Sequence, residues 1–270
     1  MMKFEISRTK RSHEFNMVKS HWHPYYELYY LVSGHCRIFI NHTLYYIDPG
    51  DMIMIAPGEI HRTTYYSSPV NERITLSFDK DCLNPITELC GSQMTDYIFR
   101  NSKITIPNGR RPYAEELIRK MEYEGTGPDG YSRIMKRNYL CELLVFLSRC
   151  QEIKKDPVRL PVTEKAIEVA AEYIYNHYAS QITLEETAGL IHMSPAYFSR
   201  KFKAVTGFGY KEYLTNIRIR EAANLLLNTS KSITEIAVEC GFGDGNYFGD
   251  AFKKIKGVPP RVFRKMQGIV

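Results

Sequence analysis

The chain has 270 residues, 44% of them hydrophobic and 24% charged, which is the composition of an ordinary folded protein large enough for two domains. A net charge of +6 permits nucleic-acid binding without requiring it, and no run of 18 apolar residues indicates a membrane-spanning helix. The six cysteines are scattered without a C-x-x-C pair, and the first ten residues lack the apolar core of a signal peptide. We therefore expect reduced thiols and a cytoplasmic protein.

The first hundred residues predict a small β-barrel. Short runs rich in β-branched and aromatic residues are interrupted by turn sequences such as Asp48-Pro49-Gly50 and Pro57-Gly58. The expected strands are 27–32, 37–40, 44–47, 52–56 and 73–78. Many short strands with close turns are typical of a sandwich or barrel, and the interior of such a barrel is a natural ligand pocket.

Two segments of this barrel combine histidine, glutamate and glycine. His21-Trp22-His23, followed by Glu27 and Gly34, reads H-x-H-x3-E-x6-G, and the stretch from Gly50 to His61 reads G-x6-P-G-x2-H. This pair of motifs resembles the cupin superfamily, in which the matching residues hold a divalent metal. The resemblance implies His21, His23, Glu27 and His61 as ligands. Two histidines in an H-x-H on one strand point to the same side, and their nitrogens suit Zn, Fe, Mn or Ni.

A plainer interpretation of the same residues stays open. Many cupin-like sensor domains bind no metal, so no cofactor is required, and the pocket would then hold an organic effector. Tyrosines and arginines near the motifs supply flat faces, hydroxyls and charge, which suit a sugar or another small polar molecule. The expected effector pocket comprises His21, His23, Glu27, Tyr29, Arg37 and His61.

The middle of the chain is predicted to be helical. We expect one helix at 85–99 and, after the break GTGPDG at 125–130, another at 132–150. The second carries a stripe of apolar residues at helical spacing, namely Ile134, Leu140, Leu143, Leu144 and Leu147. This stripe packs either on the barrel or on its copy in another subunit. A charged segment with two prolines then predicts a linker at 151–162.

Helix-start signals recur beyond the linker. After a first helix at 164–178, Thr183 with Glu186 forms a capping box, and Ser194 caps the next helix, in which Pro195 occupies the first position. A helix, a short turn and a second helix of this kind are typical of a helix-turn-helix.

The same helix-turn-helix pattern occurs a second time along the chain. Ser232 with Glu235 forms another capping box, and Asp244 is placed to cap a helix at 246–256. The string Tyr-Phe-x3-Phe-Lys-x3-Gly starts at Tyr197 and again at Tyr247, 50 residues later. Its paired phenylalanines are four residues apart, so one face of each helix is expected to be core. A long helix at 210–227 joins the two units.

Three stretches carry a family resemblance: Ile-Thr-Leu-Glu-Glu-x-Ala from Ile182, Met-Ser-Pro-x-Tyr-Phe-Ser-Arg-x-Phe-Lys from Met193, and Phe-Lys-Lys-x2-Gly-Val-Pro-Pro from Phe252. Through them, residues 183–265 resemble the AraC/XylS class of bacterial transcription regulators. A cupin-like domain ahead of the repeat is also common in that class. The resemblance implies that the second helix of each unit enters a major groove of double-stranded DNA, the two grooves about 34 Å apart.

In the first unit, the resemblance implies that Ala196, Ser199 and Arg200 meet base edges, with Arg200 suited to guanine. Alternatively, Arg200 binds a phosphate or pairs with a neighbouring acidic side chain. The expected phosphate contacts are Ser194, Lys201, Lys203, Lys211, Lys253, Lys254 and Arg264.

The second unit departs from the family pattern. Its outward face carries Gly245, Asn246, Gly249 and Asp250, where family members more often place larger polar or basic residues. Asn246 and Asp250 are the expected base contacts, and Asp250 would accept from cytosine N4 or exclude other sequences. The first unit is therefore expected to carry most of the base-specific energy.

The sequence as a whole predicts a mixed α and β fold with two domains. Residues 1–150 are expected to form a cupin-like barrel with flanking helices that binds an effector, and 163–270 an all-α domain with two helix-turn-helix units. We expect a ligand-responsive transcription factor that is not an enzyme. It is expected to be a homodimer through the helix 132–150, because a dimer raises affinity for DNA, with RNA polymerase as a further partner. The alternative is a metal-dependent cupin enzyme fused to a DNA-binding domain.

Overall fold

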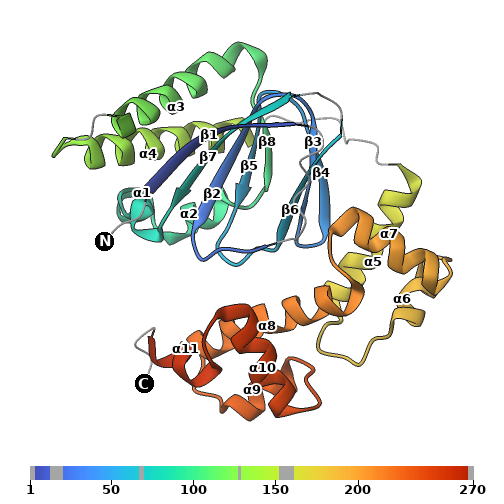
Figure 1. Cartoon of the computed structure of the whole chain (residues 1–270). Helices are drawn as coiled ribbons and strands as arrows, with labels where there is room; N and C mark the ends of the chain where they lie inside the picture. Colours follow the sequence, from blue (N-terminus) through green and yellow to red (C-terminus); the bar gives the residue numbers. More distant parts are fainter. Residues whose placement is uncertain (1–3, 13–20, 67–69, 127–128, 152–160, 267–270) are drawn as a thin grey trace. The chain divides into compact units, whose positions relative to one another are not determined.

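A computed structural model describes residues 4–12, 21–66, 70–126, 129–151 and 161–266. The chain divides into two compact units, one of Met1–Ile40 and Leu44–Arg159 and the other of Asn41–Thr43 and Leu160–Val270. The first unit is built on β-sheets and the second is helical (Figure 1). The mixed fold class is therefore confirmed. Most of the expected linker, residues 152–160, lies outside the described residues.

The first unit contains two antiparallel sheets. The larger has the strand order β1-β7-β2-β5-β8, and the smaller has the order β4-β3-β6. Their bounds are β1 Phe4–Ser12, β2 Tyr26–Ser33, β3 Cys36–Ile40, β4 Thr43–Ile47, β5 Asp51–Ile55, β6 His61–Tyr65, β7 Val70–Phe78 and β8 Lys103–Thr105. All five expected strands are present within three residues of their expected bounds. Strands β1, β6 and β8 were not predicted.

Alternation along each strand separates two cores. Leu28 and Tyr30 of β2 belong to a cluster with residues of the helices, whereas Tyr29 and Leu31 belong to a cluster with Ile38 of β3. Since successive side chains of a strand point to opposite faces, one face of the large sheet packs on helices and the other on the small sheet. Polar side chains on this second face lie between the sheets.

Four helices flank the large sheet (Figure 1): α1 Asn84–Cys90, α2 Ser92–Ile98, α3 Arg111–Thr126 and α4 Ser132–Gln151. The single helix expected at 85–99 is wrong, because the chain breaks at Gly91, whose φ of 81° lies in the left-handed region that glycine tolerates. Four of the five residues of the apolar stripe of α4 are buried within the unit, and the fifth, Ile134, is 49% exposed. Leu140, Leu143, Leu144 and Leu147 are 0% exposed and belong to the core between helices and sheet. This stripe therefore packs on the barrel, and the prediction that it forms the dimer contact is wrong.

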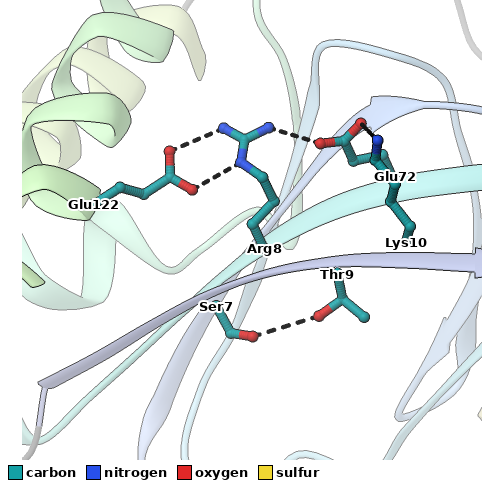
Figure 2. A network of polar contacts seen from close by, with 6 residues as sticks. All are labelled: Ser7, Arg8, Thr9, Lys10, Glu72 and Glu122. Atoms are coloured by element: carbon teal, nitrogen blue, oxygen red, sulfur yellow. Dashed lines mark hydrogen bonds and ion pairs between the residues drawn. The ribbon is translucent and has the colours of Figure 1, made fainter. Parts of the chain in front are cut away.

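An arginine on β1 links helix α3 to the large sheet. Arg8 donates from Nε and a terminal nitrogen to the two carboxylate oxygens of Glu122 at 2.8 and 2.9 Å, and its other terminal nitrogen reaches Glu72 of β7 at 2.9 Å (Figure 2). Lys10 lies 4.0 Å from the same Glu72 carboxylate. Fork-like pairing of guanidinium and carboxylate fixes direction as well as distance. The Arg8 contacts therefore orient α3 relative to β1 and β7.

The second unit contains seven helices among its described residues: α5 Val162–Asn176, α6 Leu184–Leu190, α7 Pro195–Thr206, α8 Tyr210–Asn228, α9 Ile233–Glu239, α10 Gly245–Lys256 and α11 Pro260–Met266. Both predicted capping boxes are present, at Thr183 and at Ser232. Ser194 caps α7 and Asp244 caps α10, as predicted.

The duplication extends to the helix ends. Gly207 and Gly257 both adopt left-handed φ values, 86° and 81°, and each ends its helix with a backbone hydrogen bond to the carbonyl of a lysine, Lys203 or Lys253. The pairs α6–α7 and α9–α10 are thus two copies of a helix-turn-helix, and α8 connects them. Within the described residues, no helix combines the length and apolarity that crossing a membrane requires.

Candidate effector site and nucleic-acid interface

Three histidines meet between the sheets of the first unit. His21 and His61 form an isolated antiparallel bridge through two backbone hydrogen bonds of 3.1 and 3.0 Å, which places His61 at the start of β6 opposite His21. The imidazole of His61 lies 4.2 Å from that of His21 and 4.9 Å from that of His23, measured between ring centroids. One nitrogen from each ring lies within 4.8 Å of the other two.

Backbone carbonyls orient two of these rings. His23 Nδ1 lies 2.8 Å from the carbonyl oxygen of Tyr25, and His61 Nδ1 lies 3.0 Å from that of Glu59. Because a carbonyl only accepts, both Nδ1 atoms carry the proton, and both Nε2 atoms present a lone pair. These Nε2 atoms are buried and have no hydrogen-bond partner in the described part of the chain.

Burial keeps these imidazoles neutral. It lowers the pKa of His61 to about 3 and that of His23 to about 4. The tyrosine ring of Tyr25 stacks on His23 at 4.2 Å and encloses it further. Neutral imidazoles with a free Nε2 lone pair are the form in which histidine binds metals.

Glu27 reaches the same cluster from β2. Its carboxylate oxygen lies 3.6 Å from His23 Nε2, and burial raises the pKa of Glu27 to about 7, against the opposing charge of Arg73. The structure thus brings His21, His23, Glu27 and His61 together, as the motifs predicted. Three imidazole nitrogens and one carboxylate fit the ligand preferences of a divalent transition metal, and hydrogen bonds from the far ring nitrogens are typical of such ligands.

An arginine that sequence reasoning missed lies beside this cluster. Arg73 of β7 pairs with Leu31, an interior residue of β2, and its guanidinium carbon lies 5.4 Å from the centroid of the Tyr29 ring. The Tyr29 hydroxyl is in turn 3.1 Å from that of Tyr65. The charge of Arg73 lowers the pKa of both His21 and His61, which places it within electrostatic reach of the cluster.

Arg37 is not brought to this site, so its assignment to the pocket is wrong. Its neighbours Cys36 and Ile38 belong to the interior cluster, so Arg37 points to the other face of β3. There it lies close enough to Arg62 for its charge to lower the pKa of that residue. Tyr29, in contrast, belongs to the core between the two sheets.

The second unit presents the two faces predicted for its duplicated helices. Phe198 and Phe202 of α7 and Phe248 and Phe252 of α10 are at most 1% exposed. On α7, Ala196 and Arg200 are exposed, and Ser199 is half-buried. On α10, Asn246 and Asp250 are exposed, and the backbone at Gly245 and Gly249 faces open space. The asymmetry between Arg200 and Asp250 therefore lies on matching exposed faces.

The expected phosphate-binding residues differ in their surroundings. Lys203, Lys211, Lys253 and Lys254 are exposed, and the half-buried Lys201 lies 5.6 Å from the Tyr197 ring. Ser194 is exposed and caps α7. Arg264 differs: it donates to the carbonyl oxygens of Leu226 and Lys231 at 3.3 and 2.6 Å. Its guanidinium thus holds the loop after α8, which leaves fewer donors for a phosphate than we expected.

Comparison with known proteins matches both units to family models. Residues 6–104 match the AraC-like ligand binding domain, and residues 187–266 match a helix-turn-helix domain. A Bacillus subtilis protein described as the bifunctional transcriptional activator/DNA repair enzyme AdaA is 31% identical over 146 residues, 52% of this chain and 69% of that protein.

Two relatives align over most of the chain. The uncharacterized HTH-type transcriptional regulator YisR of Bacillus subtilis is 25% identical over 89% of this chain and 86% of its own length. The HTH-type transcriptional activator RhaR of Mannheimia succiniciproducens is 24% identical over 90% and 86%. Among solved structures, the C-terminal domain of AraT, a response regulator from Geobacillus stearothermophilus, is 38% identical over 40% of this chain and 86% of that one, with a TM-score of 0.36.

These matches cover both halves in the order in which the motifs occur, and the relatives named are transcriptional regulators, one of them bifunctional. The chain belongs to the AraC family of DNA-binding helix-turn-helix transcriptional regulators and carries an AraC-type, cupin-like ligand-binding domain ahead of its DNA-binding unit.

Proposed function

We propose that this regulator senses a small polar molecule in the barrel, and that occupancy of the barrel changes its affinity for a promoter. The observation that carries this proposal is the pair of buried Nε2 atoms of His23 and His61, whose rings are oriented by backbone carbonyls but which have no hydrogen-bond partner among the described residues. Leaving buried polar atoms unpaired costs about 1–3 kcal/mol each. A site that keeps such atoms is built to receive a ligand that satisfies them.

We further propose that His21, His23, Glu27 and His61 hold a divalent metal ion. This proposal is supported by the close approach of the three histidine nitrogens, by the Glu27 carboxylate 3.6 Å from His23 Nε2, and by the carbonyl contacts that orient His23 and His61. The metal would supply a Lewis-acidic point at which an oxygen of the effector binds. Tyr29 and Tyr65 would orient that effector with their hydroxyls, and the surrounding isoleucines would exclude water.

Thermal unfolding of the full chain tests the sensor proposal. A panel of sugars and small polar metabolites is screened for a rise in melting temperature, which a ligand of the native state produces. Each compound that stabilises the protein is then added to a DNA-binding titration. The proposal expects at least one compound that does both. If no compound raised the melting temperature, or if those that did left DNA affinity unchanged, the proposal would be wrong.

On the DNA side, we propose that α7 carries most of the sequence-specific contacts. Arg200 provides a planar guanidinium on an exposed helix face, and that group pairs with the major-groove edge of guanine. Asp250 repels phosphates and accepts only from a donor such as cytosine N4. The contacts of α10 with the DNA would then come from Asn246, Lys253 and Lys254.

We also propose a homodimer through α4, although through another face than its leucine stripe. A cavity of about 890 Å³ lies among α1, α2, α3 and α4, and Val145 and Phe146 of α4 line it together with Leu89 and Tyr113. Leu89 is 86% exposed, Tyr113 46% and Val145 39%. Large apolar side chains gathered on one surface favour contact with another protein. A second copy would cover them and would pair two DNA-binding units.

Sedimentation of the full chain tests this contact. Val145→Glu should convert dimers to monomers, and Val238→Glu, which is matched in chemistry and lies on α9, should not. A monomeric wild type, or a Val145→Glu protein that remains a dimer, would contradict the proposed contact.

A further inference from the structure

We infer that the effector is a small hydroxy carboxylate, whose carboxylate binds Arg73 and whose hydroxyl faces the histidine cluster. This inference rests on the proposed sensor function and names the chemical class of its ligand. It depends on one juxtaposition: the guanidinium of Arg73 lies on the inward face of β7, in contact with Tyr29 and Tyr65 and within electrostatic reach of His21 and His61.

Register places Arg73 in the interior. It pairs with Leu31 of β2, which belongs to the core between the sheets, while the flanking Ile74 belongs to the core under the helices. An arginine on the inward face of a strand must carry its charge into the barrel. Arg73 is half-buried, so water screens its charge only in part.

The guanidinium is incompletely satisfied there. Its Nε is buried without a hydrogen-bond partner in the part of the chain that the structure describes, and the face of the Tyr29 ring lies against its charge. Glu27 is the carboxylate whose charge acts on Arg73, but Glu27 is also 3.6 Å from His23 Nε2. The guanidinium also hydrogen-bonds the side chains of Tyr29 and Tyr65, so among the described residues Nε is the donor that keeps no partner.

This arrangement selects an anion. A carboxylate matches the fork of a guanidinium with two parallel hydrogen bonds, whereas the hydroxyl of a neutral sugar offers one weaker contact. The Tyr29 and Tyr65 hydroxyls hydrogen-bond each other at 3.1 Å, so the hydroxyl that accepts this bond keeps its proton and can donate it to the same carboxylate. A neutral ligand would leave the partly buried charge unpaired, which costs affinity.

The histidines supply the second point of recognition. A hydroxyl next to the carboxylate would extend from Arg73 toward His21 and His61, where the metal-ligand set lies. Two-point recognition of carboxylate and hydroxyl distinguishes hydroxy acids and sugar acids both from plain sugars and from plain carboxylates. Among sugars, the class therefore narrows to those that carry an acid group.

Calorimetric titration of the full-length protein, loaded with zinc, tests the inference with matched probes. D-galacturonate is compared with D-galactose, and glycolate with ethylene glycol, so that each pair differs in the carboxylate alone. We expect the acid of at least one pair to bind about 100-fold more tightly than its neutral partner, as a fully formed charge-assisted contact requires. Equal affinities within both pairs, or no binding by either acid, would overturn the inference.

Substitutions at Arg73 and Arg37 test whether Arg73 is the residue that binds the carboxylate. Arg73→Gln should bring the affinity for the acid down to that for the neutral partner, and Arg73→Lys should give an intermediate value because the charge stays and the fork is lost. Arg37→Gln removes the same charge from the outward face of β3 and should bind the acid as the wild type does. If Arg73→Gln bound the acid with wild-type affinity, the inference would be wrong.

The zinc content of each variant separates this inference from the proposed function. Arg73→Gln should still bind zinc, because Arg73 is not a ligand. If zinc binds and a neutral sugar binds as tightly as its acid, the sensor proposal stands and the carboxylate inference fails. If Arg73→Gln does not fold, Arg73→Lys and the matched probe pairs on the wild type still decide the question.

Discussion

The asymmetry between the two DNA-reading helices gives a prediction whose size follows from the structure. Replacing Arg200 by alanine removes an exposed guanidinium on α7 that makes no ion pair within the described residues. The change should alter the free energy of unfolding by less than about 0.5 kcal/mol, as exposed positions usually do. Any loss of DNA affinity then reports the lost contact and not a damaged fold.

A bidentate contact between arginine and guanine contributes about 1–3 kcal/mol of base discrimination, which corresponds to a loss of roughly 5- to 150-fold in specific affinity. Asp250→Ala should raise the affinity for DNA instead of lowering it. Removing an exposed carboxylate from α10 should strengthen binding to unrelated DNA severalfold and relax the preference for cytosine at one position.

The assay is fluorescence anisotropy on a site selected from a random DNA library with the wild-type protein, at fixed salt, with unrelated DNA as the reference. The ratio of specific to non-specific affinity should fall for both variants, for Arg200→Ala through weaker specific binding and for Asp250→Ala through stronger non-specific binding. Wild-type affinity and sequence preference in both variants would refute the assignment of α7 and α10.

Three further predictions concern the DNA-binding unit. If six or more phosphates are contacted, affinity should fall about 10³-fold or more between 50 and 200 mM salt, and a flat response in the same anisotropy assay would argue against this mode of binding. Phe252→Ala should destabilise the protein by about 3–5 kcal/mol in denaturant unfolding, because Phe252 is 0% exposed, whereas Tyr247→Ala, at a 56% exposed position, should have little effect. Burial, with the charge of Arg220 acting in the same direction, lowers the pKa of Lys256 from 10.5 to about 8. The charged form is therefore disfavoured in the fold, and Lys256→Met should stabilise the protein at pH 7 by at most about 3 kcal/mol. That advantage should shrink as the pH rises from about 8 to 10.5, and an advantage that does not depend on pH would contradict this cause.

Local signals in the sequence predicted the helical unit well. The caps at Thr183, Ser194, Ser232 and Asp244 are all formed, because a cap is decided by residues within three positions of one another. The 50-residue repeat is reproduced in the burial of its phenylalanines for the same reason, since four-residue spacing fixes one face of a helix.

Features that depend on long-range pairing were harder to predict. Whether Arg37 or Arg73 enters the barrel depends on which strands pair and in which register, and a shift of one residue exchanges the two faces. The leucine stripe of α4 revealed a buried face but not the surface that buries it, which proved to be this unit's own core. The motif histidines were predicted together because the pairing of His21 with His61 is reflected in a recognisable spacing.

Calorimetric titration of the metal-free full-length protein with zinc tests most directly the proposal that the histidine cluster in the barrel is a ligand site for a metal ion. We predict one zinc ion per chain, with a rise in melting temperature. Binding should be lost in His61→Ala and retained in His35→Ala, a control outside the cluster whose imidazole contacts Asp48. Absence of zinc binding by the wild type, or equal binding by His61→Ala, would contradict the claim.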